Sequence, residues 1–142
     1  MHGPDSLTIH ATTVAINGRG LLIRGPSGSG KSALALDLIS RGAVLVADDR
    51  TIVRREGPQL IADVPEAIRG RIEARGVGIL SVPVAAPVPI VLVADLEQHE
   101  THRLPEHHET EILGVRIALA RKCEFPHFSA ALSVYLMGNR AD

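Results

Sequence analysis

The chain has 142 residues, 45% of them hydrophobic and 22% charged, which is an ordinary composition for one globular domain with a core of its own. With 15 Lys and Arg against 16 Asp and Glu the net charge is −1, so we expect no general surface for nucleic acid or for an anionic membrane. The single cysteine, Cys123, excludes an internal disulfide framework and a multi-cysteine metal site within one chain, and it fits a reducing compartment.

The first predicted element is a strand over residues 7–16, which are rich in β-branched side chains and carry His10. Asn17-Gly18 follows and supplies the positive φ values of a tight turn, after which residues 21–23 predict a second strand. We therefore expect an antiparallel hairpin at the start of the fold. A histidine on a strand is more often structural than catalytic, so the sequence pattern leaves the role of His10 open.

The segment after this hairpin has the spacing G-x-x-x-x-G-K-S of a phosphate-binding loop. It consists of Gly25, Pro26, Ser27, Gly28, Ser29, Gly30, Lys31 and Ser32. The glycines allow successive N–H groups to turn inward around an anion, Lys31 adds a cation for the outer phosphates, and Ser32 offers a hydroxyl to the Mg²⁺ that accompanies a nucleotide. The alternative is a plain glycine/serine turn between a strand and a helix.

A helix is predicted directly after the loop, over residues 33–39. Ala35, Leu38 and Ile39 share one face at helical spacing, and Gly42 is a natural C-terminal stop. The N-terminus of this helix would then point at the bound anion and add its partial positive charge. A strand before the loop and a helix after it favour nucleotide binding over a plain turn.

An apolar strand that ends in Asp is the usual source of a carboxylate for Mg²⁺ beside such a loop, and two stretches fit. Residues 43–47 end in Asp48 and Asp49, and residues 90–94 end in Asp95. Adjacent carboxylates point in different directions, so one could organise the metal while the other takes a proton from a substrate hydroxyl. This division favours Asp48 and Asp49, although a solvated strand end or a helix cap remains an alternative.

The other predicted elements form a mixed sheet with a few helices in one domain. They are a hairpin of residues 51–54 and 59–62, a short helix at 65–69, strands at 76–82, 90–94 and 112–119, and a terminal helix at 127–137. The longest apolar stretch, residues 82–94, is interrupted by three prolines and is too short to span a bilayer. We therefore expect a cytoplasmic protein.

Two further groups of polar residues have ordinary explanations. Glu73 and Arg75 stand beside a glycine-rich segment, where such residues usually form a surface ion pair. Residues 96–111 hold four histidines among glutamates, but no helix or hairpin is predicted to fix them as metal ligands. We expect an exposed loop there.

Three blocks of the chain together resemble the catalytic domain of bacterial HPr kinase/phosphorylase. They are the histidine strand with its phosphate loop, residues 41–50, and residues 72–80. The last block, Ile-Glu-Ala-Arg-Gly-Val-Gly-Ile-Leu, is similar to the family's I-E-x-R-G-x-G-I stretch and is the most specific of the three. The resemblance covers residues 7–82 and continues more weakly to Arg103. It implies an α/β fold of the P-loop, phosphoenolpyruvate-carboxykinase-like type, in which helices flank a mixed β-sheet. Residues 1–142 would form a single P-loop kinase catalytic domain.

The resemblance also implies roles for individual residues. Catalytic roles fall on His10, Lys31, Asp48, Asp49 and Arg103, and magnesium ligation on Ser32, Asp48 and Glu73. Asp49 would deprotonate the target serine. The neighbours of Arg103 differ from the family's Asp-Arg-Leu-Gly.

The family implies ATP and Mg²⁺ as cofactors, an HPr-type phosphocarrier of the sugar phosphotransferase system as partner, and a homo-oligomer, a hexamer. Its N-terminal domain has no counterpart in this chain. Its basic proline/glycine loop has no clear counterpart at residues 120–123, which favours kinase over phosphorylase activity. There are two alternatives, a small-molecule kinase and a nucleotide-responsive regulatory module without turnover. The acidic residues Asp48, Asp49 and Glu73 argue against the regulatory module, because a protein that only binds needs fewer carboxylates around the phosphates.

Overall fold

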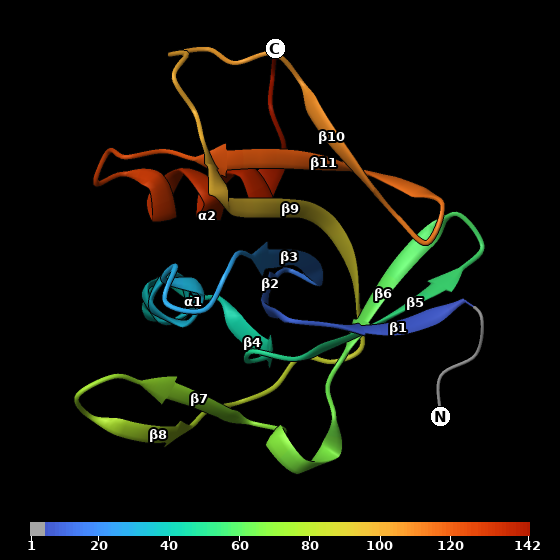
Figure 1. The fold of residues 1–142 in the computed structure, drawn as a ribbon, viewed down its shortest axis with the longest axis vertical. Coiled ribbons are helices and arrows are strands. Elements are labelled where there is room, and N and C mark those ends of the chain that lie inside the picture. Colours follow the sequence, from blue (N-terminus) through green and yellow to red (C-terminus); the bar gives the residue numbers. More distant parts are fainter. Residues whose placement is uncertain (1–4) are drawn as a thin grey trace.

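The computed structural model describes residues 5–142, which form a curled nine-stranded sheet, a separate two-stranded ribbon and two α-helices (Figure 1). The strands are β1 (Ser6–Ile9), β2 (Ala11–Ile16), β3 (Arg19–Arg24), β4 (Val44–Ala47), β5 (Thr51–Glu56), β6 (Gln59–Asp63), β7 (Arg71–Ala74), β8 (Gly78–Ser81), β9 (Val88–His99), β10 (His108–Ile112) and β11 (Val115–Lys122). The helices are α1 (Lys31–Ser40), the 3₁₀ turn η1 (Glu66–Ile68) and α2 (Phe128–Gly138).

The long strand β9 holds the large sheet together, because it pairs with β6, β3 and β11 along its 12 residues. The strand order is β1-β5-β6-β9-β3-β2-β4, and β11 joins β10 to β9. The pairs β3–β9 and β9–β11 are parallel while the other pairs are antiparallel, so the sheet is mixed as predicted.

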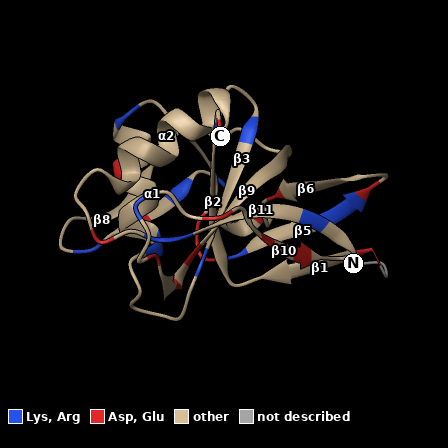
Figure 2. Ribbon diagram, turned by 90° about the horizontal axis from the view of Figure 1, so that it is seen from above, with Lys and Arg blue, Asp and Glu red and all other residues tan. Residues whose placement is uncertain are grey.

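Both faces of the central strands are buried, which explains why their sequences are apolar without interruption. Leu22 and Val93 belong to the core on one face, with side chains from β5, β6 and β11. Leu21 and Leu92 belong to the core on the other face, which α1 and α2 cover (Figure 2). This arrangement places the N-terminus of α1 directly after the end of β3, where the phosphate loop lies.

The predicted first hairpin is present as β2 and β3, with Asn17 and Gly18 at φ 52° and 72° in its turn. The predicted single strand over residues 7–16 is wrong in one respect. A bend at His10 divides it, so β1 pairs with β5 while β2 pairs with β3 and β4. His10 therefore lies between two strands that belong to different parts of the sheet.

The C-terminal half differs more from its prediction. The predicted loop over residues 96–111 is shorter, because β9 continues to His99 and β10 begins at His108. The predicted strand over 112–119 is confirmed from Val115 onward as β11, but its start is wrong, since Leu113 and Gly114 turn the chain with φ 51° and 78° and separate β10 from β11. The ribbon strand β7 was not predicted.

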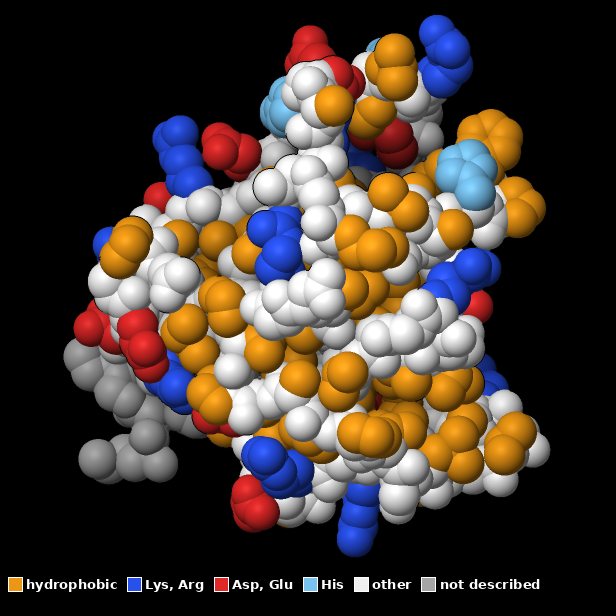
Figure 3. Space-filling model, turned by 180° about the vertical axis from the view of Figure 1, so that it is seen from behind, with side chains coloured by type: hydrophobic (Ala, Val, Ile, Leu, Met, Phe, Trp, Pro, Cys, Tyr) orange, Lys and Arg blue, Asp and Glu red, His pale blue; other side chains and the backbone are white. Residues whose placement is uncertain are grey.

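The surface mixes charges of both signs. On the face shown in Figure 3, hydrophobic side chains are spread over the middle, while Lys, Arg, Asp and Glu side chains lie mostly toward the edges. No helix within residues 5–142 combines the length and the apolar character needed to cross a bilayer.

Candidate active site

The predicted phosphate loop connects β3 to α1, and its conformation depends on its glycines. Gly28 and Gly30 have φ 80° and 98°, which side-chain-bearing residues rarely adopt, and Gly30 is the N-cap of α1. The loop closes on itself, because the Ser29 amide donates to the Pro26 carbonyl at 3.1 Å and a Cβ on Gly25 would lie 2.6 Å from Ser29 Oγ. The N–H groups at the start of α1 are thus presented to the cleft, as an anion site requires.

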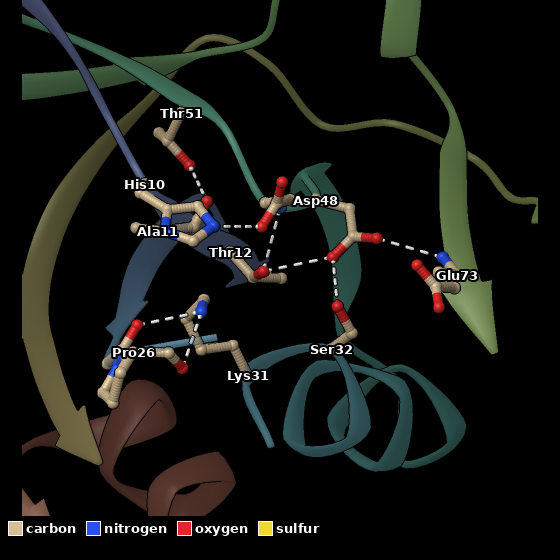
Figure 4. Close-up of polar contacts among 11 residues, drawn as sticks. His10, Ala11, Thr12, Pro26, Lys31, Ser32, Asp48, Thr51 and Glu73 are labelled. Carbon is tan, nitrogen blue, oxygen red and sulfur yellow. Dashed lines mark hydrogen bonds and ion pairs between the residues drawn. The ribbon is translucent and has the colours of Figure 1, made fainter. Parts of the chain in front are cut away.

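Lys31 is only 6% exposed and folds back over its own loop. Its ammonium donates to the carbonyl oxygens of Gly25 at 2.9 Å and Pro26 at 3.3 Å (Figure 4). These contacts hold one cation at the loop, where it can pair with the outer phosphates of a nucleotide.

Asp48 follows β4 and receives three hydrogen bonds although it is only 9% exposed. The Ser32 hydroxyl donates to Oδ1 at 2.6 Å, Thr12 Oγ1 donates to Oδ1 at 3.1 Å, and the Glu73 amide donates to Oδ2 at 3.0 Å. Figure 4 shows Asp48 between Ser32 and Glu73, the other two predicted metal ligands. The Ser32 hydroxyl and the Asp48 carboxylate are oxygen ligands of the kind that Mg²⁺ takes, whereas Glu73 contacts Asp48 through its backbone amide.

Asp49 turns away from Asp48 because its backbone is left-handed, with φ 68°. Asp is among the residues that tolerate this conformation. The Asp49 amide donates to Thr12 Oγ1 at 3.0 Å, so one hydroxyl connects both aspartates. Oδ1 of Asp49 lies 2.5 Å from Nε2 of His10, and the two side chains are 56% and 50% exposed. The structure thus brings together a buried carboxylate beside the loop and an exposed one beside a histidine.

Two cavities meet at Asp49. One, of about 460 Å³, is lined by the phosphate loop and by Arg75 and Val77 of the β7–β8 hairpin. The other, of about 640 Å³, is lined by Asp48, Arg50, η1 and the hairpin, but not by the phosphate loop. Asp49 and Glu73 line both.

Three other groups of candidate residues lie outside these cavities. Arg103 is exposed on the connection between β9 and β10. Asp95, the competing aspartate, lies at the end of β9 and is paired with Arg24 at 3.2 Å. Burial opposes its ionisation, but hydrogen bonds from the Glu97 amide, Arg24 and Gln98 outweigh burial and lower the pKa of Asp95. These contacts give Asp95 a structural role.

In the histidine-rich segment, residues 96–111, His99 and His108 pair with different glutamates. Glu100 accepts from Nε2 of His108 at 3.1 Å and from the amides of Thr101 and His102, and these hydrogen bonds lower the pKa of Glu100 although burial opposes them. His99 pairs with Glu124 at 2.5 Å. Within residues 5–142 no three His, Cys, Asp or Glu side chains are grouped as metal ligands.

Sequence reasoning missed Thr12 and the backbone contribution of Glu73. No spacing rule identifies Thr12, since its role arises only when β2 pairs with β4 and lies beside Asp48. The alternation in residues 71–74 was the available signal for β7, with Ile72 and Ala74 buried and Arg71 and Glu73 exposed.

Residues 4–121 match the family model for the HPr Serine kinase C-terminal domain. The chain is 39% identical over 126 residues to the HPr kinase/phosphorylase of Alkaliphilus metalliredigens, covering 79% of this chain and 40% of that protein. Against the HPr kinase/phosphorylase of Caldicellulosiruptor bescii it is 41% identical over 124 residues, covering 78% and 40%. The chain therefore spans about 40% of the length of these curated relatives.

Among solved structures, the HPr(Ser) kinase/phosphatase from Coxiella burnetii superposes with a TM-score of 0.78 at 27% identity, covering 94% of this chain and 96% of that one. The match extends over both helices and the curled sheet, because so little of either chain lies outside it.

Proposed function

This chain belongs to the HPr serine kinase C-terminal domain family, and from that premise we propose that it is an ATP- and Mg²⁺-dependent kinase that phosphorylates a serine of an HPr-type phosphocarrier protein. One observation carries the proposal. The predicted phosphate loop contacts a buried aspartate through Ser32, and the exposed Asp49, which is paired with His10, lines the same cleft.

In this proposal the loop amides and Lys31 hold the phosphates of ATP. Ser32, Asp48 and Glu73 would hold Mg²⁺, which neutralises phosphate charge when bound. Asp49 accepts the serine proton, and His10, 2.5 Å from its carboxylate, keeps that carboxylate directed into the cleft. Positioning and charge neutralisation supply most of the acceleration in such a reaction.

The exposure of the Asp49–His10 pair favours a protein acceptor over a small molecule. More than half of the Asp49 side chain is accessible, so a loop of another folded protein can reach it. A small-molecule kinase usually encloses its acceptor and excludes water. The site retains three acidic residues, which a regulatory module without turnover would not need.

We further propose that the reaction runs mainly toward phosphorylation, in the cytoplasm, in a homo-oligomer. The support for the direction is that residues 120–123, Ala-Arg-Lys-Cys, are a poor substitute for the basic proline/glycine loop that the family uses for dephosphorylation. A hexamer is expected by family resemblance, and native mass spectrometry measures it directly.

The test is transfer of label from [γ-³²P]ATP to HPr by the purified chain across a magnesium titration. We expect magnesium-dependent phosphoserine on HPr and none on an HPr variant with that serine replaced by alanine. Absence of transfer to HPr at every magnesium concentration, with transfer to a metabolite instead, would show that the acceptor is a small molecule.

A further inference from the structure

We propose that the 640 Å³ cavity beside Asp49 binds the acceptor protein, and that Arg71, Arg50 and Ile79 select a serine-bearing segment carrying a carboxylate and an apolar side chain. This inference rests on the proposed kinase function, because it assigns the second substrate of the same site. We call this cavity the acceptor cavity.

The β7–β8 hairpin presents one face to the acceptor cavity. Arg71 lies opposite Ser81 and Glu73 lies opposite Ile79 in the antiparallel register, so these four side chains share a face, and all four line the cavity. The alternate residue Ile72 is fully buried in the core beneath α1 and α2. Packing of the buried face therefore holds the cavity face in a fixed orientation.

The position of Asp49 and Glu73 assigns the two cavities to two substrates. The smaller cavity contains Gly30, Lys31 and Ser32, so it receives the phosphates of the nucleotide. The acceptor cavity contains none of the loop residues, yet it shares Asp49 and Glu73 with the first. In the proposed reaction, a serine hydroxyl that enters from the acceptor cavity reaches Asp49 at the border between the two cavities. The terminal phosphate of the nucleotide would reach the same border from the smaller cavity.

The acceptor cavity is lined by the carboxylates of Asp48, Asp49 and Glu73 and by two arginines, Arg50 and Arg71, which are the groups on its wall that can attract an anion. Within residues 5–142, the side chains of Arg50 and Arg71 have no hydrogen bond or ion pair, whereas Arg24, Arg54 and Arg140 all pair with carboxylates. A free guanidinium at a cavity wall fits a carboxylate in a two-pronged geometry. The acceptor segment is therefore expected to bring an Asp or Glu side chain beside its serine.

An apolar contact complements this charge. Ile79 is 67% exposed although it lies on a strand, and it lines the acceptor cavity together with Ile68 of η1. Covering a solvent-exposed isoleucine with an apolar side chain removes apolar surface from water, which favours binding of that side chain. The two contacts together distinguish the proposed segment from a purely charged or a purely apolar one.

The test compares Arg71→Glu and Ile79→Ser with Arg69→Glu in steady-state transfer to HPr. Arg69 is a matched control, because it is also exposed and unpaired within residues 5–142 but lines neither cavity. Each cavity variant should raise the KM for HPr about tenfold, the size of one interface contact. The KM for ATP should not change, and the Arg69 variant should match the wild type.

Higher salt should raise the KM for HPr in the wild type and much less in the Arg71 variant, because the arginine contact is electrostatic. An unchanged KM for HPr in both cavity variants would overturn the inference while leaving the kinase function intact. If the wild type transfers nothing to HPr, the proposed function fails instead.

In that case the inference is tested separately by measuring peptide binding. A synthetic peptide with serine between glutamate and leucine is titrated against the chain in the presence of a non-hydrolysable ATP analogue. Binding that is lost in Arg71→Glu and kept in Arg69→Glu supports the acceptor cavity. Equal binding by all three proteins, or none by the wild type, overturns it.

Discussion

Replacing Thr12 by valine removes the hydroxyl that connects Asp48 and Asp49 while keeping the size of the side chain. Thr12 is fully buried, donates to Asp48 Oδ1 and accepts from the Asp49 amide. The variant loses a hydrogen bond to a charged group and leaves a backbone N–H without its partner, which together cost about 2–4 kcal/mol. At about 3 °C per kcal/mol for a chain of this size, the Tm should fall by about 6–12 °C.

Thr13→Val is the matched control on the same strand. Thr13 is also fully buried, but its hydroxyl pairs with Thr51 Oγ1 at 2.8 Å, and Thr51 keeps its own bond to the Ala11 carbonyl. We expect a loss of about 1 kcal/mol and unchanged transfer.

The assay is thermal unfolding by circular dichroism together with the rate of transfer to HPr at a temperature where both variants are folded. Thr12→Val should slow transfer, because Asp49 loses the contact that sets its position, whereas Thr13→Val should not. Wild-type transfer by Thr12→Val, or equal slowing by both variants, would refute the reasoning about Thr12.

Three further predictions follow from single contacts. Ser32→Ala should raise the Mg²⁺ concentration for half-maximal transfer about tenfold, since a hydroxyl oxygen is lost beside Asp48, and an unchanged magnesium titration would contradict this role. Gly30→Ala should weaken binding of an ATP analogue about tenfold in calorimetry, because φ 98° costs a side-chain-bearing residue about 1–2 kcal/mol, and undiminished affinity would show that the loop tolerates a Cβ. Asp95 has a lowered pKa, so its ionised form stabilises the folded chain above the unfolded pKa of about 3.9, and this stabilisation is lost as pH falls through the lower folded value. Asp95→Asn should therefore reduce the Tm at pH 7 and flatten its decline below pH 4, and parallel Tm profiles would argue against the Arg24 pairing.

The strand–loop–helix arrangement around residues 25–32 was predictable because its signals are local. Gly30 needs its positive φ and Lys31 its place at the start of α1 whatever the rest of the chain does. The pair Asp48 and Asp49 was predictable from one apolar strand, and the competing Asp95 could be set aside only once its contact with Arg24 was known.

The parts that failed depend on pairing between distant segments. Residues 97–99 are charged or polar, yet they continue β9 because β11 lies beside them, with Lys122 opposite His99. His10 lies at a bend because β1 and β2 pair with different strands. Single-sequence periodicity contains no information about such partners, and Arg103 was assigned by resemblance to a segment whose neighbours differ.

In the proposed reaction Asp49 takes the proton from a serine, while the phosphate loop binds ATP independently of Asp49. The most direct measurement compares wild type and Asp49→Asn for transfer to HPr and for affinity toward an ATP analogue. In Asp49→Asn we expect the rate of transfer to fall by about 10²–10⁴ while the Kd for the analogue stays within about twofold of the wild-type value. Transfer at the wild-type rate by Asp49→Asn would contradict the claim.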